Sequence, residues 1–252
     1  MNNYKSSAEL KALAKEHMFG NYGTAIGASV LVAMIVGFLN LFCTMFLDIS
    51  TVIGVILNYL ISFVISVLSG LFASGTCYLY LKISCGRPVM INDVFYGFKL
   101  FPNKALLIQL YRSVWVYLGI LPMTVFSYLL GRNPQNAVLT LLYSISFILY
   151  GVVWVMVSLI YSQAFFLLHD FPNYSVRELL SMSRKLMKGS KGRLFYMIAG
   201  FLPLMLLGTL SCGIAYLWLM PYINTSCSEF FLDLIQNRQH APQGAQQKAS
   251  EF

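Results

Sequence analysis

Long apolar blocks dominate this chain of 252 residues. A bilayer with a hydrocarbon core ~30 Å thick is crossed by about 20 helical residues. The last block is long enough for two crossings, and the turn signal Ser211-Cys212-Gly213 divides it. The pattern therefore predicts an all-α, polytopic membrane protein with six transmembrane helices. The expected spans cover roughly 22–47, 52–81, 105–130, 136–168, 194–211 and 214–236.

The basic residues gather on one side of these expected spans. Of the 17 Lys and Arg residues, all but Arg112 and Arg132 lie before span 1, between spans 2 and 3, between spans 4 and 5, or after span 6. Arg112 falls inside span 3, and Arg132 falls in a loop on the opposite side. Cytoplasmic loops of membrane proteins carry the excess of Lys and Arg, so we expect both termini in the cytoplasm.

Composition also indicates what the chain binds. It is 58% hydrophobic and only 10% charged, whereas soluble domains carry about 25% charged residues. In a soluble protein the net charge of +8 would suggest nucleic acid. At a membrane surface each basic residue gains about 1 kcal/mol against anionic lipid. We therefore expect membrane lipids, especially anionic headgroups, as partners, no nucleic acid, and a protein partner that the sequence does not specify. The predicted anionic-lipid surface comprises Arg184, Lys185, Lys188, Lys191 and Arg193.

Short amphipathic helices are predicted in the cytoplasmic segments. Ser6-x-x-Glu9 and Ser175-x-x-Glu178 fit the capping box that opens a helix, and each precedes an apolar stripe with basic residues elsewhere on the helix. A weaker third copy lies at 92–98. This favours three units, each a short helix plus a membrane hairpin, although capping signals that arose independently would give the same pattern. Residues 1–236 form one expected membrane domain, and 237–252 are an expected disordered cytoplasmic tail.

The sequence offers little catalytic chemistry. Known catalytic patterns such as H-E-x-x-H and G-x-S-x-G do not occur, so we expect no enzyme, no cofactor and no metal. His169-Asp170 is the one candidate acid–base pair, and a polar end to span 4 is the alternative. Among the five cysteines, a Cys43–Cys212 bridge is one alternative, and five packing thiols is the other.

Arg112 carries the sharpest residue-level expectation. It lies about 12 Å deep in span 3 at 1.5 Å per residue, where an Arg costs about 2.5–3.5 kcal/mol. Glu229 of span 6 is expected at a similar depth. We predict an intramembrane Arg112–Glu229 ion pair, supported by Gln109, Tyr111 or Tyr161. The alternative is that Arg112 reaches lipid phosphates while Glu229 lies in the interface.

Several strings resemble a bacterial family of integral membrane proteins named domain of unknown function 975. They are GNYG at 20–23, LKISCGRP at 81–88, DVFYGF at 93–98, DFPNYS at 170–175, KGSKGRLF at 188–195 and GIAYLWLMPY at 213–222. The resemblance implies a multi-pass protein of the bacterial plasma membrane and supplies no activity. The predicted arrangement of spans is more distantly similar to the membrane domain that precedes some glycerophosphodiester phosphodiesterases. This sequence lacks the catalytic barrel of those enzymes.

Two functions fit these observations. The first is a non-enzymatic, lipid-interacting or accessory role in envelope homeostasis, in which basic helices face anionic lipid. The alternative is a small-molecule or lipid transporter, which the expected proline kinks in spans 3, 5 and 6 favour.

Overall fold

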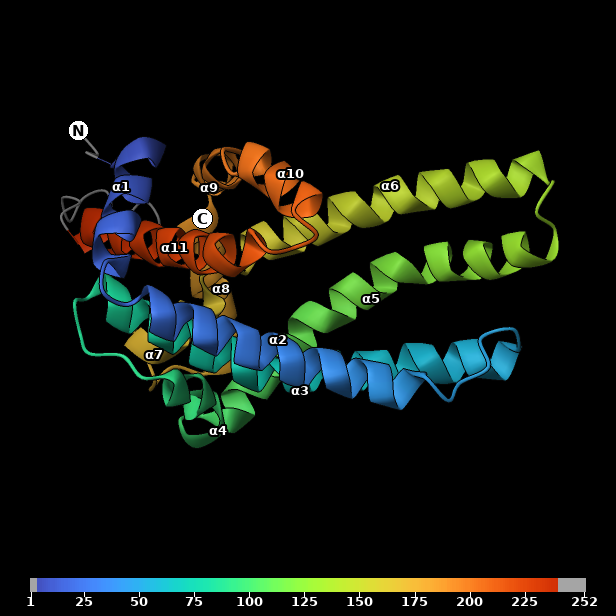
Figure 1. The fold of residues 1–252 in the computed structure, drawn as a ribbon, viewed down its shortest axis with the longest axis horizontal. Helices are drawn as coiled ribbons and strands as arrows, with labels where there is room; N and C mark the ends of the chain where they lie inside the picture. Colours follow the sequence, from blue (N-terminus) through green and yellow to red (C-terminus); the bar gives the residue numbers. More distant parts are fainter. Residues whose placement is uncertain (1–3, 240–252) are drawn as a thin grey trace. The chain divides into compact units, whose positions relative to one another are not determined.

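Every regular element in the residues that the structure describes, 4–239, is a helix, as predicted from the apolar blocks. The structure is a computed structural model (Figure 1). The elements are α1 (Ser7–Met18), α2 (Tyr22–Thr44), α3 (Val52–Ser84), the 3-10 helix η1 (Ile91–Phe95), α4 (Tyr96–Lys99), α5 (Pro102–Arg132), α6 (Ala137–Ile160), α7 (Ala164–Asp170), α8 (Val176–Met187), α9 (Lys191–Ala199), α10 (Leu202–Leu210) and α11 (Tyr216–Gln239).

Five helical segments in the described residues are long and apolar enough to cross a membrane. They are Tyr22–Thr44, Val52–Ser84, Pro102–Arg132, Ala137–Asp170 and Lys191–Leu210. Large apolar side chains project outward from them, for example Phe38 and Phe42 of α2 and Ile148 of α6. Apolar surface of this extent on long helices is typical of a membrane protein.

The last apolar block divides where the sequence predicts. Helix α10 ends at Leu210 and α11 begins at Tyr216. Cys212 and Gly213 between them have positive φ angles of 52° and 92°, and glycine adopts such angles without steric cost. Helix α11 carries the acidic residues Glu229 and Asp233 and is not among the five spanning candidates.

The prolines expected to kink spans differ in their effect. Pro122 and Pro221 lie inside α5 and α11. Pro203 instead lies in the first turn of α10, where a missing backbone N–H costs nothing. The fifth spanning segment is therefore two helices, α9 and α10, divided at Gly200 and Phe201.

The chain divides into two units. Unit 1 comprises Met1–Val30, Thr76–Asp93 and Lys188–Phe252, and unit 2 comprises Leu31–Gly75 and Val94–Met187. In unit 1, α1 packs against α11 (Figure 1). Leu10, Ala14 and Met18 of α1 are fully buried there, so most of the predicted apolar stripe of this helix contacts protein.

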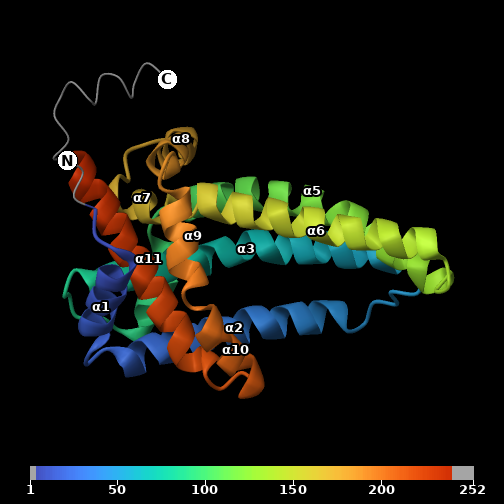
Figure 2. The ribbon, with the colours of Figure 1, turned by 90° about the horizontal axis from the view of Figure 1, so that it is seen from above.

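Unit 2 is built on the α5–α6 hairpin, whose two helices run side by side in both views (Figures 1 and 2). Helix α8 packs against α5, α6 and α7, and Ser183 donates a 2.9 Å hydrogen bond to the carbonyl of Ile160. Two glycines allow close approach of backbones. A Cβ on Gly75 would overlap the carbonyl of Val94, and a Cβ on Gly97 would overlap that of Leu71.

Both predicted capping boxes are present. The backbone N–H of Ser6 donates to Glu9 at 2.6 Å, and Glu9 N–H donates back to Ser6 Oγ at 3.2 Å. Ser175 and Glu178 make the same exchange before α8. The expected tail of 237–252 begins too early, since α11 continues to Gln239. Residues 240–252 of that tail lie outside the described residues.

Candidate functional site

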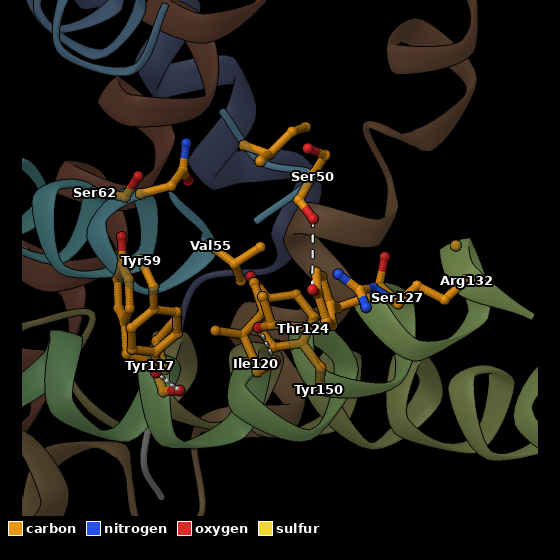
Figure 3. A pocket seen from close by; sticks show the side chains of 15 residues that line it. Ser50, Val55, Tyr59, Ser62, Tyr117, Ile120, Thr124, Ser127, Arg132 and Tyr150 are labelled. Carbon is orange, nitrogen blue, oxygen red and sulfur yellow. Dashed lines mark hydrogen bonds between the residues drawn. The ribbon is translucent and has the colours of Figure 1, made fainter. Parts of the chain in front are cut away.

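A half-open cavity of about 830 Å³, lined by polar and apolar groups, lies in unit 2 near the α2–α3 and α5–α6 turns (Figure 3). This volume is within the range of ligand sites, about 300–1,000 Å³. Side chains of α3, α5 and α6 and of the α2–α3 turn form its walls. The lining residues are Ile49, Ser50, Val55, Asn58, Tyr59, Ser62, Val116, Tyr117, Ile120, Thr124, Ser127, Tyr128, Gly131, Arg132 and Tyr150.

More than half of the lining residues carry a hydroxyl group. Eight of these residues are Ser, Thr or Tyr, one is an Asn, and the single charged residue is Arg132. Its guanidinium lies 5.1 Å from the ring centroid of Tyr128, close enough for a cation–π contact. No Asp or Glu lines the cavity. The cavity therefore offers many hydrogen-bonding groups and one positive charge.

Some of these hydroxyls are already hydrogen-bonded. Tyr59 donates to the carbonyl of Tyr117, and Thr124 donates to the carbonyl of Ile120 at 2.8 Å. Figure 3 shows both bonds, and the rings of Tyr59 and Tyr117 meet edge to face with centroids 5.2 Å apart. These bonds fix the cavity wall and leave other polar groups available.

Three of the polar side chains that line the cavity have no hydrogen-bond partner within residues 4–239. They are Asn58, Ser62 and Ser127. Asn58 lies about 9 Å along α3 from Val52 at 1.5 Å per residue. The Asn58 and Ser62 side chains are half-buried and that of Ser127 is exposed. Their polar groups are therefore available to a polar molecule in the cavity.

The helices meet closely at one end of the cavity. Ser66 of α3 lies 3.0 Å from Ser113 of α5, hydroxyl to hydroxyl. One turn further along α3, the backbone of Gly70 contacts Gln109. Toward the turns, Tyr128 of α5 donates a long 3.4 Å bond to the carbonyl of Ser50 in the α2–α3 turn. The cavity is thus closed at one end and bordered by a weak bond at the other.

An apolar groove of about 400 Å³ adjoins the cavity. Val55, Tyr59, Thr124 and Tyr128 line both spaces, so they form the partition between them. The groove's remaining lining is entirely aliphatic. It consists of Val52, Ile56, Leu60, Leu121, Val125 and Leu129.

The residues of the predicted anionic-lipid surface have different surroundings. Arg184, Lys185 and Lys188 are exposed, and Lys191 is half-buried. Arg184 also donates a 3.2 Å bond to the Tyr111 hydroxyl and lies over the ring of Tyr161. The opposite side of α8, including Leu179, Leu180 and Leu186, is buried.

Arg193, the fifth member, has a structural role that sequence analysis did not foresee. It donates 2.9 Å bonds to Asp233 and to the carbonyl of Lys5, and its guanidinium lies 4.3 Å from the centroid of Tyr4. It therefore connects α9, α11 and the segment before α1 within unit 1.

Arg112 and Glu229 lie in different units, and their pairing stays a prediction. Glu229 contacts His17, whose Nδ1 lies 2.7 Å from Oε1. Arg112 lies over the ring of Phe165, 5.6 Å from its centroid. Neither neighbour was predicted from the sequence.

His169 has a structural neighbour in unit 2. Its Nε2 lies 2.8 Å from the carbonyl oxygen of Ser74, and this bond connects α7 to α3. Asp170 is exposed beside it. Within the described part of the chain, no three His, Cys, Asp or Glu side chains are grouped so that they could hold a metal. Cys43 and Cys212 are both thiols.

The cavity itself was not predicted. Two sequence signals point to it in retrospect. One is Arg132, the lone basic residue in a loop that the sequence predicts on the opposite side to the others, and the other is Asn58, an amide within an apolar block. Neither signal alone shows that α3 and α5 leave space between them.

Comparison with known proteins identifies the family. No curated protein and no solved structure matches the chain. The family model described as "Protein of unknown function (DUF975)" matches residues 1–238, which is nearly the whole chain and agrees with the resemblance carried by the sequence motifs. The chain belongs to this family.

Proposed function

We propose that the chain is a six-crossing protein of the bacterial plasma membrane with both termini in the cytoplasm. Five helical segments supply candidate spans, and α11 is the sixth. The turn before α11 supports this count, because it lets the last apolar block return across the membrane. The distribution of Lys and Arg supports the orientation. The threefold arrangement of a short helix before each hairpin is part of the same proposal.

Within this topology, the protein acts without catalysis by binding anionic lipid headgroups on its cytoplasmic face. One observation carries this proposal. Helix α8 buries its apolar side in unit 2 and leaves Arg184 and Lys185 exposed, and Lys188, directly after the end of α8, is also exposed. A helix fixed in this way presents its charges without inserting. Each basic residue near an anionic surface contributes about 1 kcal/mol. An accessory role in envelope homeostasis would use such lipid binding.

The test uses the full chain in lipid nanodiscs. Native mass spectrometry counts retained phosphatidylglycerol for the wild type and for a variant combining Arg184→Gln, Lys185→Gln and Lys188→Gln. We expect the variant to lose about 3 kcal/mol of lipid binding at low salt and the difference to disappear near 1 M salt, where the Debye length is ~3 Å.

A control variant removes three other basic residues that the topology places in the cytoplasm, Arg87→Gln, Lys99→Gln and Lys248→Gln. It matches the change in net charge and leaves α8 intact. Equal losses in the two variants, or equal retention of neutral phosphatidylcholine by the wild type, would reject α8 as the binding surface.

A small-molecule or lipid transporter is the second candidate, and the cavity of unit 2 favours it. The proline kinks expected from the sequence lie in spans 3, 5 and 6, whereas this cavity lies between α3, α5 and α6, which are spans 2, 3 and 4. In the proposed topology, the turns beside the cavity face the outside of the cell.

A further inference from the structure

We infer that the cavity and the adjoining groove of unit 2 together bind one lipid of the outer leaflet that carries a phosphate and free hydroxyls, of the phosphatidylglycerol type. The headgroup occupies the polar cavity, and one acyl chain lies in the aliphatic groove. This inference rests on the proposed topology and names the substrate class for the transporter candidate. It is separate from the basic surface on α8.

The polar half of the ligand follows from the cavity's chemistry. A glycerol headgroup both donates and accepts hydrogen bonds, and Ser and Asn side chains do the same. Asn58, Ser62 and Ser127 line the cavity without partners in the described part of the chain. A hydroxylated headgroup would satisfy these groups within the spanning region, where lipid chains offer no hydrogen bonds.

The charge of the ligand follows from Arg132. It is the one charged residue that lines the cavity, and it lies near the α5–α6 turn (Figure 3). An Arg fork suits phosphate geometry. No lining carboxylate would repel an anion or attract a choline or ethanolamine group. The lining therefore favours an anionic headgroup over a zwitterionic one.

The apolar half follows from the groove. Its aliphatic lining can hold a hydrocarbon chain, and it shares Val55, Tyr59, Thr124 and Tyr128 with the cavity. One molecule with a polar and an apolar end can fill both spaces at once. A small soluble solute would fill the cavity alone, so the groove selects a lipid.

The test is photocrosslinking in nanodiscs that contain the full chain and phosphatidylglycerol with a diazirine in one acyl chain. Peptide mass spectrometry then locates the adducts. We expect adducts on groove residues of α3 and α5, separate from any on α8. Phosphatidylcholine with the same diazirine keeps the phosphate but has a choline in place of the hydroxylated glycerol. It therefore leaves Asn58, Ser62 and Ser127 without hydrogen-bond partners and should label the groove about tenfold less.

Two variants test the cavity, each with a matched control. Arg132→Gln removes the charged partner of the phosphate, and Asn58→Leu removes a hydrogen-bond partner of the glycerol, so each should reduce groove labelling by about tenfold. Arg177→Gln removes a charge outside the cavity. Asn40→Leu removes a spanning amide that already bonds the carbonyl of Val36. Both controls should label as the wild type does. Asn58→Leu places an apolar residue in a span, so membrane insertion is preserved.

Three results would overturn the inference. The first is equal groove labelling by both lipids, and the second is unchanged labelling in both cavity variants. The third is loss of labelling when soluble glycerol phosphate is added, because this would assign the cavity to a free solute. The lipid-retention experiment on α8 tests only the proposed cytoplasmic surface, and the labelling experiment tests only the cavity and groove. Failure of one proposal can therefore be told from failure of the other.

Discussion

The imidazole Nδ1 of His17 lies 2.7 Å from Oε1 of Glu229, and this pair joins α1 to α11 inside unit 1. The Glu229 side chain is 5% exposed and that of His17 is 33% exposed. Removing one partner of a buried pair leaves an uncompensated group. We expect His17→Ala to destabilise the protein by about 1–2 kcal/mol, less than a fully buried pair would cost because His17 is partly solvated.

Thermal unfolding in detergent measures this effect. The combination of His17→Ala with Glu229→Gln should recover part of the loss, because the stranded carboxylate is gone. The same double-mutant cycle with Arg112→Ala tests the ion pair predicted between Arg112 and Glu229. Strict additivity in a cycle would rule out coupling for that pair.

Asp233 accepts hydrogen bonds from Arg193 at 2.9 Å and from the backbone N–H of Lys5 at 3.2 Å. Its side chain is 2% exposed. Arg193→Gln should therefore destabilise unit 1 by about 2 kcal/mol or more. Lys191→Gln, two residues away, is the matched control and should change stability little. Similar shifts of the unfolding temperature in both variants would contradict the structural role of Arg193.

Gly75→Ala should destabilise unit 2 by about 1–3 kcal/mol or more, because the new methyl group would overlap the backbone of Val94. Gly151 lies in α6 with open space around it. Gly151→Ala should be neutral or slightly stabilising, since alanine favours a helix. Unfolding temperatures of the two variants measure the difference, and equal values would show that the backbones can separate without cost.

The start of α8 should loosen in acid. Hydrogen bonds from the backbone and hydroxyl of Ser175 hold the pKa of Glu178 below its ordinary value of 4.5. A depressed pKa stabilises the folded cap above the ordinary value, and this contribution is lost as the pH falls through the folded-state pKa. Hydrogen-exchange protection of the Glu178 amide should fall over that range. In Glu178→Gln the protection should no longer depend on pH there, and an unchanged profile would contradict the cap.

Local signals predicted the helical elements well. The capping boxes at Ser6 and Ser175 and the turn at Cys212 and Gly213 are encoded by adjacent residues, so the sequence shows them directly. Long-range pairs are different. His17 contacts Glu229 across most of the chain, and Arg193 contacts Asp233. Charge and spacing restrict the possible partners without selecting one.

The cavity could likewise not be predicted from the sequence. Hydroxyl residues within spans are ordinary packing groups when their helices meet, as Ser66 and Ser113 do. They form a polar site only where helices stay apart, as beside Ser62. That distinction depends on how α3 and α5 approach each other, and small differences in packing decide it.

Reporter fusions test the proposed topology, on which the lipid-binding proposals depend. Fusions after Ser50, Asn133 and Cys212 should report the outside of the cell. Fusions after Met90, Lys185 and Ala245 should report the cytoplasm. This result would place the turns beside the cavity in contact with the outer leaflet. A cytoplasmic signal after Cys212 would contradict six crossings, and a cytoplasmic signal after Ser50 and Asn133 would contradict an outer-leaflet ligand.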